Sequence, residues 1–154
     1  MSANVIVVVE QEFAHPRPRV FRAWTAAEEM SQWRGSPGWH VERESVTSDL
    51  RTGGKHHHVK VRDDDPSVRV PPDAVFTEYF DPDGFVARQR ITGDSGIDPN
   101  ESLELRVEFT AMGGDSTLVR IVQGPYDPAV AQYHAAGWEK ELARLGTYLD
   151  GGQA

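Results

Sequence analysis

The sequence predicts an α+β fold in which a curved antiparallel sheet of about six to seven strands wraps around one long helix near the C-terminus. Three observations support this prediction. Residues 4–33 read as one strand followed by two short helices, residues 39–123 read as strands separated by turns, and residues 128–149 carry a helical pattern. Strands joined by short turns pair antiparallel, and a sheet with an apolar face has to be covered by another layer. We therefore expect the last helix to lie against the sheet.

The chain begins with a strand and a short helix. Residues 4–13 are mostly β-branched and too short a run for a helix, so they are predicted to form a strand that the following prolines end. Val20, Phe21 and Trp24 then recur on one face of a helix that a proline opens. This first helix is expected to turn its apolar face toward the core.

A second short helix is predicted directly after the first. Thr25, followed three residues later by Glu28, fits the capping-box pattern, and Met30 and Trp33 then lie on the inner side. Glycine and proline at positions 35–38 end the helix. Trp33 is thereby a candidate for the core and for a pocket wall.

The middle of the chain alternates between strands and turns. Strands are predicted over residues 40–48, 55–62, 74–80, 85–92, 103–109 and 117–123. The Asp-Pro-Asp-Gly sequence at 81–84 is a strong hairpin signal, whereas residues 93–101 are predicted to form a polar loop. Residues 103–110 alternate apolar and polar side chains, which is typical of a half-buried antiparallel strand.

The last predicted element is a helix over residues 128–149. Its apolar residues recur at helical spacing and are Ala131, Ala135, Trp138, Leu142, Leu145 and Leu149. Glu139, Lys140, Glu141 and Arg144 are placed on the other, polar face. At 1.5 Å per residue the helix is roughly 30 Å long, enough to cross a small sheet. Such a helix packs on a strongly curved sheet more easily at its ends than at its middle, so we expect an internal cavity between them.

Composition excludes several classes of function. The chain has 154 residues, a formal net charge of −8 and no cysteine. Without a basic patch it is not expected to bind nucleic acid, and without cysteine it has no disulfide or thiolate chemistry. The apolar run at residues 5–9 is too short for a signal peptide or a membrane span. We expect one cytoplasmic domain over residues 1–154 that does not insert into a membrane and that can form a homodimer.

Four stretches of the chain carry a resemblance to a known family. They are VFRAWTAAEEMSQW at 20–33, SDLRTGGKHHH at 48–58, DPDGFV at 81–86 and HAAGWEKELARLGTYL at 134–149. Together they resemble the activator of heat-shock protein 90 ATPase homologue-like family, within the START-like, polyketide-cyclase-like (SRPBCC) superfamily. Thr52 departs from the pattern, because the family usually has proline there.

The resemblance implies a helix-grip fold whose cavity takes a small apolar or amphipathic molecule. It does not imply a particular reaction, because most single-domain members have no assigned one, and a fold by itself does not determine a function. No cofactor is implied either.

Three consecutive histidines lie on the strand predicted at 55–62. Side chains alternate along a strand, so His56 and His58 share one face and His57 lies on the other. The valines that follow favour the His57 face as the inner one, whereas the resemblance implies that positions 56, 58 and 60 point into the cavity. We follow the resemblance. Lys60 departs from the family, which has an apolar side chain there, and places an ammonium inside the pocket or at its rim.

The histidine pair has three interpretations. In the first, His56 and His58 supply two nitrogen ligands for a metal ion, with His134, Glu78 or an acidic neighbour as a third ligand. A His-x-His pair is a weak signal, so no metal site is predicted. The interpretation we favour is that the imidazoles line a polar end of the cavity and bond a ligand oxygen or water. In the third interpretation, the histidines lie on an exposed strand face and have no functional role.

The remaining candidates come from neighbouring elements. The full set of candidate pocket residues is Trp33, His56, His58, Phe76, Glu78, Arg88, His134 and Trp138. Glu78 shares a strand face with Phe76 and Phe80, so it is expected to point inward and to pair with Arg88 or Arg90 rather than to act as a catalyst. His134 lies one turn before Trp138 on the same helix face.

Three functions remain open. The leading one is the binding of a hydrophobic or aromatic small molecule in the cavity. The second is an enzyme of the cyclase, dehydratase or hydrolase range, with His56, His58 and Glu78 as acid–base groups. The third is a module that interacts with a chaperone or another protein partner. Convergent polar groups in a closed cavity favour the first two, and an exposed apolar patch favours the third.

Overall fold

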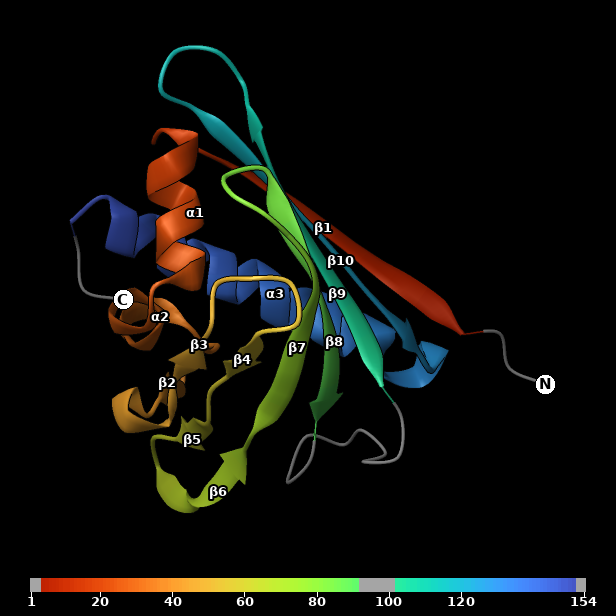
Figure 1. Ribbon diagram of the computed structural model, residues 1–154. Helices are drawn as coiled ribbons and strands as arrows, with labels where there is room; N and C mark the ends of the chain where they lie inside the picture. The colour runs from red at the N-terminus through yellow and green to blue at the C-terminus, as the bar shows by residue number, and fades with distance from the viewer. Residues whose placement is uncertain (1–3, 92–101, 152–154) are drawn as a thin grey trace.

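The computed structural model describes residues 4–91 and 102–151 (Figure 1). In chain order its elements are β1 (Val5–Phe13), α1 (Arg17–Thr25), α2 (Ala27–Trp33), β2 (Trp39–Val41), the short 3₁₀ turn η1 (Arg43–Ser45), β3 (Thr47–Ser48), β4 (Lys55–His57), β5 (Lys60–Arg62), β6 (Asp65–Val70), β7 (Pro72–Phe80), β8 (Gly84–Ile91), β9 (Leu103–Ala111), β10 (Thr117–Tyr126) and α3 (Pro128–Leu149). The loop predicted over residues 93–101 lies outside the described residues.

The strands form two sheets. Seven of them make one antiparallel sheet in the order β1-β10-β9-β8-β7-β4-β3, and β2, β5 and β6 make a smaller one. α3 covers one face of the large sheet, and α1 and α2 lie on the same side of it (Figure 1). The predicted α+β helix-grip fold is therefore confirmed, with its two short helices after the first strand. None of the described helices is both long and apolar enough to span a membrane.

Aromatic side chains fill the space between the helices and the sheet. The ring of Trp24 from α1 stacks on that of Trp138 from α3, with centroids 5.8 Å apart, and it contacts Phe85 and Phe109 of the sheet at 6.3 and 6.2 Å. Leu142, one turn beyond Trp138, is fully buried. The middle of α3 is thus in close contact with the core.

The junction of the two short helices differs from the predicted capping box. α1 continues through Thr25, whose hydroxyl donates to the carbonyl of Phe21 at 3.0 Å, and Ala26 occupies the N-cap of α2 without a side-chain bond. A threonine hydroxyl that bonds four residues back is not available to cap the next helix. The indole N–H of Trp33, at the end of α2, donates to the carbonyl of Ala23 at 2.8 Å and ties α2 to α1.

The strand predicted at 55–62 is broken into two. β4 pairs with β7 in the large sheet, β5 pairs with β2 and β6 in the small sheet, and His58 and Val59 lie between them. The backbone N–H of Val59 donates to the hydroxyl of Ser45 at 2.8 Å, and its carbonyl accepts from the N–H of Glu42 at 3.0 Å. These bonds replace the ladder that a continuous strand would have made, and they place Lys60 on the smaller sheet.

A bulge in β7 overturns the expected position of Glu78. Phe76 pairs with Ala87 of β8, but Glu78 pairs with Val86, so β7 contains an extra residue at this point. A bulge shifts the alternation of side chains by one residue. Phe76 is therefore buried in the core, while Glu78 lies on the outer face of the sheet with its side chain 45% exposed.

Candidate functional site

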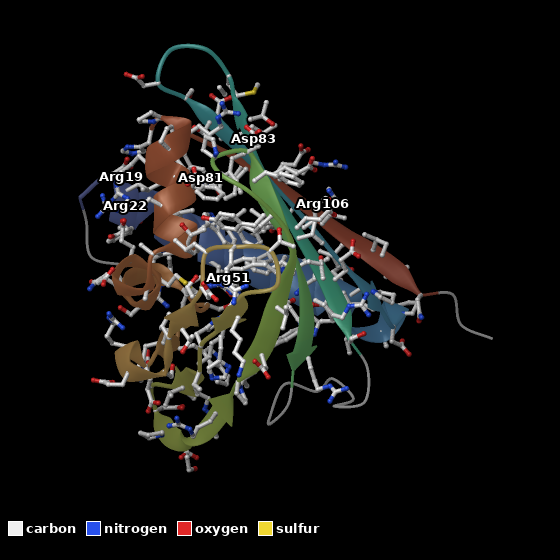
Figure 2. The ribbon with its side chains drawn as sticks, in the orientation of Figure 1. Arg19, Arg22, Arg51, Asp81, Asp83 and Arg106 are labelled. Atoms are coloured by element: carbon white, nitrogen blue, oxygen red, sulfur yellow. The ribbon has the colours of Figure 1, made fainter. Side chains whose placement is uncertain are left out.

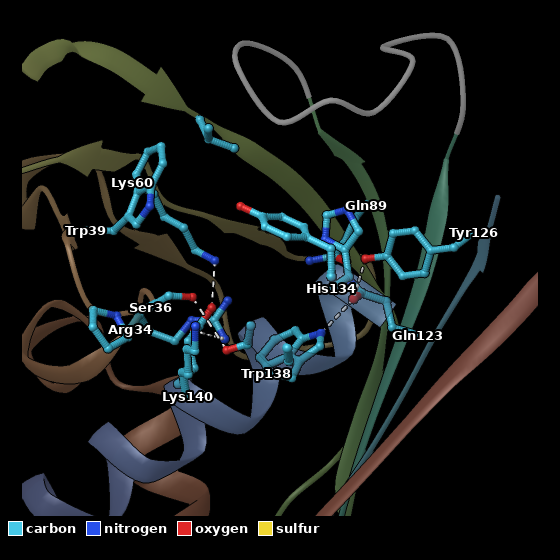
Figure 3. Close-up of a pocket in the computed structure, with 16 residues that line it drawn as sticks. Arg34, Ser36, Trp39, Lys60, Gln89, Gln123, Tyr126, His134, Trp138 and Lys140 are labelled. Carbon is cyan, nitrogen blue, oxygen red and sulfur yellow. Dashed lines mark hydrogen bonds and ion pairs between the residues drawn. The ribbon is translucent and has the colours of Figure 1, made fainter. Parts of the chain in front are cut away.

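A pocket of about 370 Å³ lies beside residues 133–141 of α3 (Figure 3). α3 forms one wall, and the loop from Arg34 to Trp39 after α2 forms a second. Lys60 of β5 and Val70 of β6 contribute from the small sheet. The large sheet closes the pocket through side chains of β8 and β10. The pocket therefore lies where the helix, the loop and both sheets meet, close to the predicted cavity but at one end of the core.

The sheet side of the pocket is a hydrogen-bonded chain centred on Gln123 of β10. Its side-chain oxygen accepts from the hydroxyl of Tyr126 and from the indole N–H of Trp138, both at 2.6 Å, and its amide nitrogen donates to the side-chain oxygen of Gln89 at 2.6 Å. This order of donors and acceptors leaves the amide nitrogen of Gln89, a donor, at the far end of the chain. His134 stacks on the ring of Tyr126 at 4.4 Å.

The opposite side of the pocket holds a buried ionic cluster. Glu141 of α3 accepts a hydrogen bond from the ammonium of Lys60 at 2.8 Å and another from the backbone N–H of Gly35 at 3.1 Å. Burial alone would raise the pKa of Glu141, but Lys60 and Arg34 outweigh it and lower this pKa to about 2. Glu141 is therefore ionised at neutral pH. Burial lowers the pKa of Lys60, and Glu141 opposes that change.

The guanidinium of Arg34 lies in an aromatic cage. The rings of Trp24, Trp33 and Trp138 lie 5.2, 5.5 and 5.1 Å from its central carbon, which is close enough for cation–π attraction. The nearest carboxylate oxygen, on Glu141, is 3.5 Å from Nη1. The side chain is only 3% exposed, and among the described residues its Nε and Nη1 atoms have no hydrogen-bond acceptor. Arg34 is thus a buried cation whose hydrogen bonds are incomplete.

The two inward histidines lie next to Arg34 rather than in the pocket wall. The ring of His58 is almost fully buried, and its Nε2 is 3.5 Å from Nη2 of Arg34. Since a guanidinium only donates, this nitrogen is the acceptor, and neutral His58 carries its proton on Nδ1. Burial and the repulsion of Arg34 lower the pKa of His56 to about 3 and that of His58 well below the ordinary value. Both imidazoles are neutral near pH 7.

A further arginine fixes the loop that forms the second wall. Nη1 of Arg144 donates to the backbone carbonyls of Gly35, Ser36 and Trp39 at 2.9, 3.2 and 2.8 Å. Gly35 has a φ of +101°, which favours glycine because it lacks Cβ. The loop that carries Arg34 into the pocket is therefore held to α3 by two side chains that the sequence placed on the polar face of the helix, Glu141 and Arg144.

The structure brings together only part of the predicted site. His134 and Trp138 line the pocket. Trp33, His56, His58 and Phe76 are buried in the adjacent core and do not form its wall. The structure places these four beside the pocket, in the packed core, because their rings contact other core side chains.

Glu78 and Arg88 do not line this pocket. Arg88 is exposed, and a carboxylate oxygen of Glu78 lies 3.7 Å from the guanidinium of Arg106 of β9 rather than beside Arg88 or Arg90. Figure 2 shows Arg106 on the side of the sheet that faces away from α1. The acid–base trio of His56, His58 and Glu78 is therefore not assembled. In residues 4–91 and 102–151 there is no group of three or more His, Cys, Asp or Glu side chains arranged to hold a metal ion.

Several pocket residues were missed, although the sequence contains signals for some of them. Gln89 is two residues beyond Ala87 on the inward face of its strand, and Gln123 is two residues beyond Ile121. Glu141 lies three residues after Trp138, at the edge of the apolar stripe of α3. Alternation and helical spacing therefore predict these three side chains. They do not predict the position of Arg34, which follows the end of α2.

The family follows from a comparison of the whole chain with known sequences. A search of the curated proteins found no match. The sequence profile of the family described as "Activator of Hsp90 ATPase homolog 1-like protein" matches residues 14–150. The chain belongs to this family. The match spans all three α-helices, the pocket and every strand except β1, so the likeness inferred from four short stretches extends over almost the entire fold.

Solved structures show the same fold within and around this family. An AHSA1 protein from Silicibacter pomeroyi superimposes with a TM-score of 0.81 at 18% identity, over 95% of this chain and 98% of that one. A protein from Chromobacterium violaceum has a TM-score of 0.80 at 16% identity, over 93% and 95% of the two chains. DynU16, from the dynemicin biosynthetic locus, has a TM-score of 0.73 at 18% identity and matches 98% of this chain with 49% of its own. Identities this low show a shared fold only.

Proposed function

We propose that this protein binds a small amphipathic molecule in the pocket beside α3. The observation that supports the proposal is the pocket itself, whose volume of about 370 Å³ lies within the usual range for small-molecule sites, roughly 300–1,000 Å³. Its walls combine aromatic surface with several polar and charged side chains. Such a combination holds an apolar body by burial and fixes its orientation through the polar groups.

The aromatic surface lies where a ligand would enter. Tyr133, on the outer side of α3, is 72% exposed, and Trp39 lies across from the helix on the second wall. Trp138 forms the inner wall, but its N–H is bonded to Gln123 and is unavailable to a ligand. The apolar part of a bound molecule therefore contacts ring faces, and the remaining hydrogen bonds come from the sheet side and the ionic cluster.

The test uses a neutral fluorescent probe, N-phenylnaphthylamine, whose emission rises when it leaves water. Ala136 lines the pocket, so Ala136→Trp fills it, whereas Ala143→Trp adds the same ring to an exposed site two turns further along α3. We expect saturable binding to the wild-type protein and to the Ala143→Trp variant, and a loss of affinity of at least about tenfold in Ala136→Trp. Equal binding by both variants, or no saturable binding at all, would refute the proposal.

A further inference from the structure

We propose that the molecule bound in this pocket carries a single carboxylate, which binds at the inner end beside Lys60 and Arg34. The inference rests on the proposed small-molecule binding and adds the chemical class of the ligand. Its basis is the charge of the pocket wall, the direction of its hydrogen bonds and the incomplete pairing of the buried Arg34.

The pocket wall is positively charged in a protein that is strongly negative overall. Arg34, Lys60 and Lys140 line it, while Glu141 is the one acidic side chain among its described lining residues. The chain as a whole carries a formal net charge of −8. A cationic pocket wall in a protein of net negative charge favours a negatively charged ligand, because opposite charges attract most strongly where water is excluded.

The buried ionic cluster at the inner end of the pocket has one more positive charge than negative charges. Arg34 and Lys60 are two cations, and Glu141 is their single carboxylate partner. The neighbouring His56 and His58 are uncharged near pH 7 because burial and Arg34 lower both pKa values. A group with one negative charge would neutralise the cluster. A dianion such as a phosphate ester would leave an excess of negative charge in a site of low polarity, which is unfavourable.

Two polar groups of the pocket wall, on Lys60 and Gln89, offer hydrogen-bond donors without partners for all of them among the described residues. Both oxygens of Glu141 are engaged, one by Lys60 and the other by Gly35. Among the described residues, Glu141 is the only acceptor that Lys60 reaches, so its ammonium has further N–H groups to offer, and its side chain is 22% exposed. The amide nitrogen of Gln89 also ends its chain as a donor. Donors of this kind bind an acceptor-only group such as a carboxylate.

The buried guanidinium provides an independent indication. Its Nε and Nη1 atoms lack acceptors among the described residues, and a buried charged group without its hydrogen bonds is strongly unfavourable. The three indole rings around Arg34 compensate through attraction to its charge, but they do not accept its N–H groups in the way an oxygen does. A carboxylate on Lys60 places a negative charge next to this cation, as the positions of both side chains in Figure 3 show.

The experiment compares an acid with its amide. Naphthoic acid and naphthamide have the same ring system and nearly the same size, but only the acid is ionised at about pH 7.5. Each displaces bound N-phenylnaphthylamine, and the displacement curves give the two affinities. We expect the wild-type protein to bind the acid at least about tenfold more tightly than the amide, since a charge-assisted hydrogen bond is stronger than a neutral one.

Two matched variants locate the charge. Lys60→Met keeps the aliphatic stem and removes the ammonium at the inner end of the pocket. Lys140→Met makes the same change at the other lysine of the pocket wall, which lies on the exposed side of α3. Lys60→Met is expected to reduce the preference for the acid to about threefold or less, and Lys140→Met to keep most of the wild-type preference. The ratio of acid affinity to amide affinity is compared within each variant, so a general change in the pocket cancels. The wild-type comparison remains decisive if Lys60→Met does not fold.

The outcomes separate the two proposals. A dye that does not bind the pocket refutes the small-molecule function. A dye that binds and is displaced equally by acid and amide leaves that function standing and overturns the carboxylate. A preference for the acid that disappears in Lys140→Met but persists in Lys60→Met overturns the assignment to the inner end of the pocket.

Discussion

The burial of His56 predicts that the folded protein loses stability in acid, by an amount that follows from the lowered pKa of this residue. Its ring lies in the core 4.8 Å from that of Phe76, its Nδ1 is 3.2 Å from the hydroxyl of Ser48, and its pKa is lowered to about 3. Burial is the main cause and the positive charge of Arg34 is the second. The folded protein therefore keeps this imidazole neutral under conditions in which the unfolded chain protonates it.

The sign of the effect follows from proton linkage. The folded pKa lies below the unfolded value of 6.5, so the unfolded state binds more protons and stability falls as the pH is lowered through 6.5. At 1.36 kcal/mol for each pH unit, lowering the pH to about 5 removes about 2 kcal/mol of unfolding free energy through this residue alone. The loss approaches about 5 kcal/mol near pH 3, where the folded state also becomes protonated. His58 acts in the same direction.

The assay is urea unfolding followed by tryptophan fluorescence at about pH 7.5 and about pH 5, at low protein concentration. His56→Gln removes the titrating group, and Phe76→Leu is the matched control because it disturbs the same part of the core without removing a proton site. We expect the loss of unfolding free energy between the two pH values to be about 2 kcal/mol smaller in His56→Gln than in the wild type, and unchanged in Phe76→Leu. An equal loss in all three proteins would refute the assignment of a buried neutral His56.

Four further predictions concern stability and the pocket. Glu141→Gln leaves two buried cations without their carboxylate, so it is expected to reduce the unfolding free energy measured by urea unfolding by about 3–5 kcal/mol. Glu139→Gln, at an exposed position on the same helix, is expected to change it by less than about 0.5 kcal/mol. Arg144→Met removes three hydrogen bonds to carbonyls of the loop from Arg34 to Trp39, so it is expected to reduce unfolding free energy by about 2 kcal/mol and to weaken dye binding. Normal dye binding by this variant would contradict the role of Arg144 in fixing the loop. Gly54→Ala would place a Cβ 2.1 Å from the carbonyl oxygen of Asp49, so thermal unfolding should show a loss of about 1–3 kcal/mol, while Gly137→Ala, whose Cβ meets nothing closer than 3.6 Å, should be neutral or stabilising. Glu78→Gln should leave dye affinity unchanged because its side chain is on the outer face, and a clear loss of affinity would contradict that outward position.

Local patterns in the sequence predict most of the elements correctly. The helix expected at 128–149 is α3 with the same bounds, and the hairpin signal at 81–84 lies between β7 and β8. The alternation at 103–110 is the half-buried strand β9. These features succeed because apolar spacing and turn residues depend on backbone geometry within one segment.

The errors occur where an interaction between segments changes the geometry of one of them. The bulge at Thr77 reverses the faces of the last residues of β7, and no local signal in the Phe76–Phe80 stretch marks it. The bonds of Val59 to Ser45 and Glu42 break a strand that its own sequence favours. Neither change is visible in a pattern that considers one segment at a time, because the partners are distant in the chain.

The sequence by itself determined the fold class and the long helix, which follow from periodicity and from likeness to a family. The inward direction of His56 and His58 came from the likeness alone, because the valines that follow favour the opposite face. Only the tertiary structure decided which polar side chains meet at the pocket. Arg34, Lys60 and Glu141 come from a loop, a strand and a helix. Only Lys60 was expected at the pocket, from the likeness to the family, whereas the pattern around Glu141 assigns it to the polar face of its helix. Burial becomes favourable only when their charges and hydrogen bonds are combined, and that combination exists only after the three segments have packed together.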